Sequence, residues 1–476
     1  MLSVPRRIFP AYYAEVLCPR LISLQRQNCS SHGGYQRKRF GTGFICFILR
    51  RTRKMPRKIN IDHVTKIEGH AKLHIKIDKG EVKKVKLNLF EGSRFFEGIL
   101  KGKHFNDVNH IASRICGICS VVHGITSVRT TEKAMNINVS EQTEVLREML
   151  NIAGIIQSHA VHLYFLTLPD YTGHCNAVQM AQQHPQHIKK ALNIKKFAND
   201  VVRIIGGRTV HPYTVRPGGF TRIPDENHFK QLLKFAKNCL SDARSTAETF
   251  CGLKYPDFSR ETKHFALKGK HYFCPSDNIA CAGSDKCFAV PDYEKHFKEY
   301  FKQGSTSEFT RKNEKSYMVG AWSRIRNNWD LLSRESKELT KCIMPRKFSP
   351  FMNNPAQAVE IFEGTKRVID ILESTDFSDE KPVEIKPKSG TGIAALEAPR
   401  GILFHKYKYN KKGITTFINL TTPTTQNLAN LEEDIKNFLP TILNKPKKEI
   451  QLEIEKLIRA YDPCISCATH FLDIVW

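Results

Sequence analysis

Two short stretches of sequence decide how this chain is interpreted: Arg114-Ile115-Cys116-Gly117-Ile118-Cys119 and Asp462-Pro463-Cys464-Ile465-Ser466-Cys467. Each stretch holds two cysteines with two residues between them, a spacing that lets both sulfurs face one ion. Four thiolates together form a soft, tetrahedral set of metal ligands. The sequence therefore predicts a metal site to which both ends of the chain contribute.

Zinc is the default occupant of four cysteines, but the distance along the chain is unusual for it. Zinc ribbons place their two pairs about 15–20 residues apart, whereas 344 residues separate Cys119 from Cys464. A structural zinc site is one alternative, although a small local fold would not need the whole chain to close it. A thioredoxin-like redox motif is another, but two copies without a βαβ pattern argue against it.

The charge of the chain first suggests nucleic acid or an anionic membrane surface as partner. The 476 residues carry a formal net charge of +27, of which +10 lies in residues 1–54. The remaining +17 is spread diffusely over the other residues, which argues against a nucleic-acid site. No apolar run approaches the roughly 18 residues of a membrane span, and Gly43–Leu49 is far too short. The sequence predicts neither a nucleic-acid partner nor a membrane span.

Residues 1–54 do not have the sequence pattern of a folded protein, because they are rich in arginine, poor in acidic residues and lack a sustained helical or strand period of apolar residues. An organelle transit peptide or a twin-arginine signal at Arg6-Arg7 are alternatives. We favour a natural start at Met55, with 1–54 a basic extension, disordered or non-native, and 55–476 a single domain. The fourteen cysteines are too sparse for a disulfide scaffold. We therefore expect reduced thiols and a cytoplasmic location.

The apolar pattern predicts a mainly helical α+β fold. Strand-like alternation at Leu73–Ile77 and Val85–Leu89 flanks a turn at Asp78-Lys79-Gly80 and predicts a β-hairpin. Ser140 is a plausible N-cap for a long amphipathic helix. Further helices are predicted at 188–205, 226–250, 322–340, 356–372, 428–438 and 447–460. Residues 258–291 are predicted to form an irregular external insertion, 375–387 a charged linker, and 390–417 short strands and turns.

The chain resembles the large, catalytic subunit of nickel–iron hydrogenases over essentially all of 59–470. The RxCGxC and DPCxxC motifs carry the resemblance, and the quinone-binding subunit of respiratory complex I, which shares the fold, lacks these four cysteines. Further matching motifs are KIEGH at 66–70, FFEGILKGK at 95–103, GGR-x-x-HP at 206–212, YMVGA at 317–321, ALEAPRG at 395–401 and PTTQN at 423–427. The resemblance implies a central helix bundle with small peripheral sheets and reversible heterolytic cleavage of dihydrogen.

The resemblance implies a role for each matching residue at the metals. Cys116, Cys119, Cys464 and Cys467 would hold nickel, and Cys119 and Cys467 would also bridge to an iron carrying carbon monoxide and cyanide. Arg400 would lie over the metals with Asp462 as its counter-ion, and Pro399 and Thr424 would line the cyanides. Glu68 and the terminal thiolate Cys464 would take up protons. His123, which would hydrogen-bond a bridging sulfur, and Arg114 of the first motif would surround the ligands.

A second metal site and a maturation step are also implied. Glu97, His470 and the carbonyl of Leu420 match ligands of magnesium or a second iron. In the family an endopeptidase cuts after the histidine of DPCxxCxxH, here between His470 and Phe471. The chain departs from the membrane-bound and periplasmic enzymes at Ser158, where they carry an aspartate.

The resemblance extends to the partners. Details of the motifs look most like the soluble multi-subunit group that is linked to NADP(H) and also called sulfhydrogenases. NAD-linked and deazaflavin- or heterodisulfide-linked enzymes are the alternatives. The chain has no Rossmann GxGxxG motif and no ferredoxin cysteine pattern, so electrons would pass to a small subunit with iron–sulfur clusters, then to flavin/NAD(P)-binding and ferredoxin-like subunits. The alternative from another class is a non-catalytic basic scaffold that binds zinc.

Overall fold

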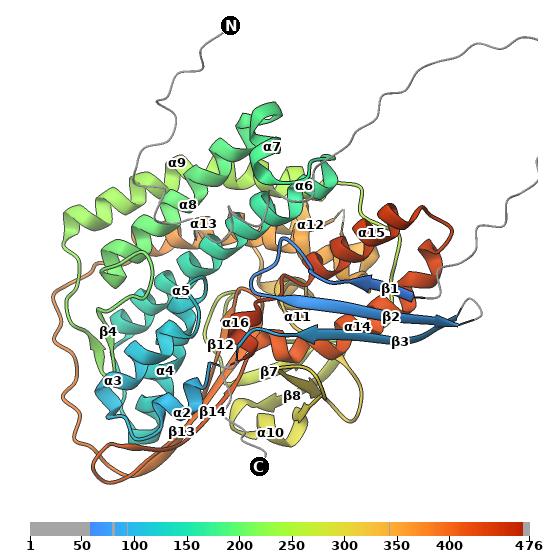
Figure 1. Ribbon diagram of the computed structural model, residues 1–476. Coiled ribbons are helices and arrows are strands. Elements are labelled where there is room, and N and C mark those ends of the chain that lie inside the picture. Colours follow the sequence, from blue (N-terminus) through green and yellow to red (C-terminus); the bar gives the residue numbers. More distant parts are fainter. Residues whose placement is uncertain (1–57, 79–80, 93, 342, 470–476) are drawn as a thin grey trace, which may run out of the picture.

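The computed structural model describes residues 58–78, 81–92, 94–341 and 343–469 (Figure 1). The predicted extension 1–54, His470 and the residues after it lie outside the described part, so the predicted domain division stays a prediction. Within the described residues helices predominate, and the strands form small separate sheets. The predicted mainly helical α+β class is confirmed.

Five long helices form the central bundle: α4 (Ser120–Met135), α5 (Glu141–Val161), α8 (Pro185–Gly206), α9 (Glu226–Cys251) and α13 (Asn353–Ser374). α13 packs against both α9 and α5, and α8 lies against α5 and α9 (Figure 1). The predicted cap of α5 is present, since the Ser140 hydroxyl accepts a hydrogen bond from the Thr143 amide at 3.0 Å. Most of α5 is buried on every side, which places it in the middle of the bundle.

The helix predicted over 322–340 is interrupted, so that prediction was wrong. α11 (Ala321–Asn328) is followed by a 3₁₀ turn (Trp329–Leu331), and α12 (Arg334–Thr340) starts anew. Ser333 caps the new helix, because its hydroxyl accepts from the Ser336 amide at 3.3 Å. The Glu363 carboxylate binds both serine hydroxyls. A polar N-cap in the middle of an apolar period therefore ends one helix and begins the next.

The predicted hairpin is confirmed as part of an antiparallel sheet of β1 (Lys58–Ile61), β2 (Ala71–Asp78) and β3 (Glu81–Leu89). Leu73 pairs with Leu87 and Ile75 with Val85, so the alternating apolar side chains share one face. The sheet lies on α14 (Pro423–Ile442), and the Leu87 amide donates to Glu432 at 2.9 Å. This contact joins the sheet near the beginning of the described residues to a helix near their C-terminal end.

A second antiparallel sheet carries residues of the predicted metal site. It consists of β12 (Gly390–Ala398), β13 (Gly401–Tyr409) and β14 (Thr415–Thr421), longer strands than predicted. The sheet lies directly on α4. A Cβ atom at Gly392 would come within 2.0 Å of the Thr130 carbonyl oxygen, so glycine is needed for this close approach. The tight turn between β12 and β13 holds Pro399 and Arg400.

The segment 258–291 is no irregular external insertion, which corrects the prediction. It forms β6 (Lys263–Leu267), β7 (Asn278–Cys281) and β8 (Ser284–Ala289), in a four-stranded sheet with β11 (Tyr317–Met318). Phe265 and Ile279 are buried in one apolar cluster with Ile402 and Phe404 of β13. Leu267 and Val290 of the segment belong to the same cluster, whereas Phe258, Tyr272 and Phe273 are buried in the main core.

Shorter elements complete the described chain. The segment 375–387 contains no helix or strand, which agrees with the predicted linker. α15 (Lys447–Ala460) has the predicted bounds. The remaining elements are α2 (Phe96–Leu100), α3 (Phe105–Ala112), α6 (Leu168–Tyr171), α7 (Ala177–Gln183), α10 (Tyr293–His296), α16 (Ile465–Ala468), β4 (Val215–Arg216), β5 (Gly219–Phe220), β9 (Lys298–Phe301) and β10 (Glu308–Arg311). None of the helices in the described ranges combines the length and the apolar character that crossing a membrane requires.

Candidate metal centre

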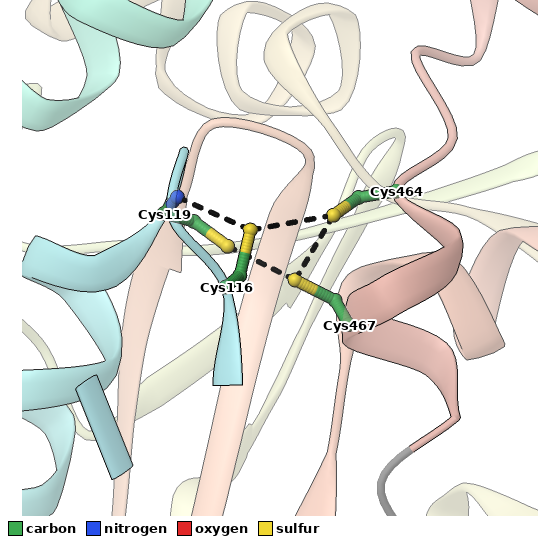
Figure 2. Close-up of side chains that lie close together, drawn as sticks. All are labelled: Cys116, Cys119, Cys464 and Cys467. Atoms are coloured by element: carbon green, nitrogen blue, oxygen red, sulfur yellow. Dashed lines mark hydrogen bonds between the residues drawn. The ribbon is translucent and has the colours of Figure 1, made fainter. Parts of the chain in front are cut away.

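The four predicted cysteine ligands meet at one buried point. Their sulfur atoms all lie within 4.8 Å of one another. The Cys119 sulfur is 3.0 Å from that of Cys467, and the Cys116 sulfur is 3.5 Å from that of Cys464. Figure 2 shows the two pairs entering from opposite sides, one before α4 and one at α16. Over the described ranges, no other set of three or more histidine, cysteine or acidic side chains converges in this way.

A contact between the KIEGH and DPCxxC motifs closes the site. Glu68 forms a parallel β-bridge with Cys464, and the Ile465 amide donates to the Glu68 carbonyl at 3.0 Å. Gly69 has φ +83°, and a Cβ atom there would come within 2.5 Å of Ile465 Cβ. Only glycine combines this conformation with such a close approach. Gly69, the fourth residue of KIEGH, therefore lets residues 66–70 approach the DPCxxC motif.

The four thiols perturb one another's pKa values. Hydrogen bonds from the other three thiols hold the pKa of Cys116 well below its usual value. The pKa of Cys464 lies well above that value, mainly through its hydrogen bond with Cys116, and burial raises the pKa of Cys467 likewise. If all four lose their protons, as thiolate ligands do, the buried charges need a cation to balance them. The donor set fits a soft metal such as nickel.

Arg400 supplies a positive charge beside the sulfurs. Its guanidinium is buried and donates to the Asp462 carboxylate at 2.8 Å and to the Asp462 carbonyl. Burial opposes its charge, but Asp462 and the cysteines hold the pKa of Arg400 well above its usual value. The Ser158 hydroxyl accepts from Arg400 at 3.4 Å.

Asp462 is itself held by residues that the sequence analysis missed. The Gln357 amide donates to the second Asp462 carboxylate oxygen at 3.1 Å. His162 Nδ1 lies 2.5 Å from Gln357 Oε1, and its Nε2 lies 2.7 Å from the Arg459 carbonyl oxygen. His162 begins a π-helical segment (His162–Thr167) that continues α5. Such segments are common at functional sites, but the amphipathic period does not reveal them.

Glu68 reaches the cluster from the other side. Its Oε2 atom lies 3.2 Å from Cys464 Sγ and 2.9 Å from the Ser466 amide nitrogen, and the Ser466 hydroxyl donates to Oε1. Burial first, and the negative charge of Cys116 second, raise the pKa of this carboxyl group. A carboxyl group with a raised pKa that touches a thiol can accept and pass on a proton.

A small cavity adjoins Cys119 and Cys467. Three residues of the predicted iron side, Pro399, Arg400 and Thr424, line it. The Thr424 hydroxyl oxygen accepts from the Cys464 amide at 3.1 Å, which leaves its hydrogen free to donate. His123 also lines the cavity, with Nε2 3.8 Å from Cys467 Sγ. Burial lowers the pKa of His123 to about 4, so the imidazole is neutral.

The remaining predicted residues have different outcomes. Glu97 and Leu420 lie together, since the Leu420 amide donates to Glu97 Oε1 at 2.9 Å, while their third partner His470 lies outside the described residues. Arg114 was predicted to surround the ligands, and this prediction was wrong. Its side chain is exposed and donates to the His110 carbonyl at 3.3 Å. The 3₁₀ turn Ser113–Ile115 buries its neighbours and turns the arginine to solvent.

Comparisons with known proteins agree with the site. A family model described as nickel-dependent hydrogenase matches residues 94–190 and 331–470, and a HoxL-like model matches 58–91. The alpha polypeptide of sulfhydrogenase 1 from Pyrococcus furiosus is 35% identical over 419 residues, covering 87% of this chain and 97% of the relative. The corresponding polypeptide of the F420-non-reducing hydrogenase from Methanothermobacter thermautotrophicus is 29% identical, covering 87% and 95%.

Solved structures show the same fold. An NAD⁺-reducing [NiFe]-hydrogenase in the H₂-reduced state superposes with a TM-score of 0.78, at 21% identity, over 87% of this chain and all of that one. A [NiFeSe]-hydrogenase of Desulfomicrobium baculatum gives 0.70 at 21% identity, over 87% and 100%. The family match favours an enzyme over the zinc-binding scaffold. The chain belongs to the nickel-dependent hydrogenase family, in which it is a large, catalytic subunit.

Proposed function

We propose that Cys116, Cys119, Cys464 and Cys467 hold nickel, and that Cys119 and Cys467 also bridge to an iron carrying carbon monoxide and cyanide. The convergence of four buried sulfurs within 4.8 Å is the observation that carries this proposal. When bound, the metals supply the soft, redox-active site at which dihydrogen is split into protons and electrons. The other residues of the site would orient the ligands, exclude water or move protons.

The cavity beside Cys119 and Cys467 suits the iron and its small ligands. Arg400 is permanently charged and can donate to a cyanide nitrogen. The Thr424 hydroxyl has a hydrogen to donate, and Pro399 offers an apolar wall without an amide donor. Asp462, braced by Gln357, keeps the guanidinium of Arg400 in place.

Proton transfer falls to Cys464 and Glu68. The thiolate of Cys464 would take the first proton and become a thiol, and the contact of 3.2 Å between its sulfur and Glu68 Oε2 would let it pass that proton to the Glu68 carboxylate. Because the pKa of Glu68 is raised, its protonated state is accessible under conditions where an exposed glutamate would be ionised. Ser466 holds the carboxylate through both its amide and its hydroxyl, which fixes the acceptor relative to the sulfur.

A hard cation, magnesium or a second iron, would be held by Glu97, the Leu420 carbonyl and His470. Carboxylate, carbonyl and imidazole suit such an ion. We further propose that an endopeptidase cuts between His470 and Phe471 once nickel is loaded. Intact-mass measurement of active enzyme tests the cut: loss of Phe471–Trp476 is expected, and a nickel-loaded form that keeps them would contradict it.

Electrons are proposed to leave through a small subunit with iron–sulfur clusters, and then through flavin/NAD(P)-binding and ferredoxin-like subunits to NADP(H). The order of similarity supports a sulfhydrogenase-like enzyme: the Pyrococcus furiosus alpha polypeptides are 35% and 32% identical, while the beta polypeptide of the NAD-reducing hydrogenase HoxS of Cupriavidus necator is 26% identical. NAD and a deazaflavin or heterodisulfide are the alternative classes of electron acceptor. Working thiolates require reduced cysteines, which fits the expected cytoplasmic location.

Metal analysis and infrared spectroscopy of the purified complex test the proposed centre. Nickel and iron should be present together, and bands of metal-bound carbon monoxide and cyanide should appear. Zinc alone, without such bands, would contradict the proposal. Assays with NADP⁺, NAD⁺ and a deazaflavin as acceptors would then identify the electron acceptor, with an artificial dye as the control for dihydrogen oxidation itself.

A further inference from the structure

A buried arginine of α11, Arg324, binds the turn between β12 and β13 that carries Arg400. A guanidinium group has five N–H groups, and Arg324 uses all five as hydrogen-bond donors. Two of these bonds go to the main chain: Nη1 donates to the Ala398 carbonyl at 2.7 Å, and Nη2 donates to the Pro399 carbonyl at 3.0 Å. One side chain therefore holds both residues that directly precede Arg400.

The other three hydrogen bonds of Arg324 go to two carboxylates. Nε and Nη2 donate to the two oxygens of Glu360 at 2.7 Å each, and Nη1 donates to Glu397 Oε2 at 2.9 Å. Arg324 is 1% exposed and Glu360 is 0% exposed. Because a guanidinium group is planar and rigid, a bidentate pair of this kind fixes its orientation. The contacts with the two carbonyls are fixed with it.

Glu360 connects Arg324 to other elements around the site. The Tyr272 hydroxyl donates to Glu360 Oε1 at 2.8 Å, and Glu360 Oε2 lies 2.8 Å from His159 Nε2. His159 is fully buried in α5 and directly follows Ser158, whose hydroxyl accepts from Arg400. The carboxylate that seats Arg324 is thus itself held in place from two sides.

Helix α13 supports Arg400 at both of its ends. Gln357 of this helix binds Asp462, and Asp462 accepts from the guanidinium group of Arg400. Glu360 follows Gln357 by three residues, so the two lie on the same side of the helix. Glu360 binds Arg324, which holds the main chain just before Arg400. One helix therefore determines where the Arg400 side chain starts and where it ends.

We infer that Arg324 and Glu360 are positioning residues for Arg400: by fixing the two carbonyls before it, they direct its guanidinium group towards the cysteine cluster. This inference rests on the proposed function in so far as Arg400 faces the ligands of an iron. An arginine side chain is long, so a shift of its main chain moves its charged end unless both ends are held. A misplacement of about 1 Å can cost about 100-fold in rate.

A second buried pair provides the control, because a buried ion pair can also serve the packing alone. Arg147 of α5 is 1% exposed and donates to both oxygens of Glu132 at 2.8 and 2.6 Å. It also donates to a main-chain carbonyl, that of Arg216, at 3.3 Å. Among the hydrogen bonds of the described residues, neither Arg147 nor Glu132 contacts residues 398–400 or Asp462. Equal substitutions in the two pairs therefore remove equivalent bonds, but only one pair adjoins Arg400.

Nitrogen NMR of the full chain without metals gives the first readout. In protein labelled with ¹⁵N-arginine it follows the Nε–H group of Arg400, which donates to the Asp462 carbonyl, and an Arg400→Lys spectrum assigns the signal. Arg324→Lys leaves a single ammonium group that cannot reach all four acceptors. Glu360→Gln leaves one acceptor oxygen where the guanidinium group needs two. Each variant should shift the signal and speed its hydrogen exchange about tenfold, as expected for the loss of one hydrogen bond.

The two substitutions change opposite partners of the pair, so the test does not depend on the folding of one variant alone. The controls Arg147→Lys and Glu132→Gln should leave the position and the exchange rate of the Arg400 signal unchanged. An unchanged signal in Arg324→Lys or Glu360→Gln would overturn the inference. Equal changes in the variants of both pairs would overturn it as well, since they would indicate a general loss of packing.

Infrared spectra of the metal-loaded complex give the second readout. Arg324→Lys should shift the cyanide bands and lower kcat about 10- to 100-fold, because a displaced Arg400 donates differently to the iron ligands. Arg147→Lys should match the wild type in both. Identical bands in all three proteins would overturn the positioning role. Wild-type complex without any such bands would instead contradict the proposed metal centre and leave the NMR result standing.

Discussion

The Oε2 atom of Glu68 lies 3.2 Å from the sulfur of Cys464, although the two residues are 396 positions apart in the chain. The β-bridge between the same two residues holds their backbones together as well. The Glu68 carboxyl group and the Cys464 thiol are thus positioned by main-chain contacts, which substitution of the Glu68 side chain leaves in place. Variants of Glu68 therefore test its chemistry separately from its position.

Glu68→Gln should keep the metals bound and slow proton exchange. Glutamine retains the shape and can accept from the Ser466 amide while donating to the Ser466 hydroxyl, but it cannot accept a proton. Isotope exchange between dihydrogen and water should therefore fall about 100-fold or more. The matched control is Glu91→Gln, which removes a carboxylate that is hydrogen-bonded to His70, away from the cysteines. Full exchange in Glu68→Gln, with nickel and iron retained, would rule out the relay role.

Cys467→Ser should abolish dihydrogen uptake. The Cys467 sulfur lies 3.0 Å from that of Cys119 and 3.1 Å from that of Cys464, so its loss leaves three of the four thiolates. A serine hydroxyl is a harder ligand than a thiolate and binds nickel poorly. Cys239→Ser, at a buried cysteine of α9, is the control. Dihydrogen uptake and nickel content should fall only in the first variant, and uptake in it would refute the ligand assignment.

Glu299→Gln should stabilise the protein at alkaline pH. Burial, together with the nearby Glu308, raises the pKa of Glu299 from 4.5 to about 8, and its Oε1 atom has no hydrogen-bond partner among the described residues. Between these two pH values the folded state binds more protons than the unfolded state, so stability falls as the pH rises. The wild type should lose about 4 kcal/mol between pH 5 and pH 9 that Glu299→Gln retains.

Urea unfolding across that pH range measures the effect. Glu314→Gln, on an exposed turn, corrects for the removal of one charge. Parallel stability curves for the wild type and Glu299→Gln would show that the carboxyl group is ionised in the folded protein at little cost. They would thereby contradict the raised pKa.

Gly392→Ala should destabilise the contact between β12 and α4. The added Cβ atom would meet the Thr130 carbonyl oxygen at 2.0 Å, and this backbone cannot move without shifting α4. Overpacking of this kind costs about 1–3 kcal/mol or more. Gly92→Ala is the control, because a Cβ there meets nothing within 4 Å. Thermal unfolding should separate the two variants, and equal melting temperatures would disprove the tight packing.

Much of the fold could be predicted from local patterns. The hairpin at Leu73–Leu89, the Ser140 cap and the bounds of α15 follow from periods and caps that are written in consecutive residues. The break at Ser333 and the strands of 258–291 could not be predicted. The new helix after Ser333 depends on Glu363, which is 30 positions away in the sequence. The strands of 258–291 have too few apolar residues for a clear period, and residues from other segments, among them Ile402 and Phe404, bury Phe265 and Ile279.

The sequence by itself was enough to predict the four cysteine ligands and the hydrogenase chemistry, because the two CxxC pairs and the family motifs around them can be recognised from consecutive residues alone. Only the tertiary structure decided that the two cysteine pairs meet and that Arg114 faces solvent. It also decided that Gln357 hydrogen-bonds to Asp462 and that His405 contacts His123. The physical reason is distance along the chain. Contacts between residues hundreds of positions apart depend on how helices and sheets pack. Such packing leaves no local pattern in the sequence around the residues that make the contact.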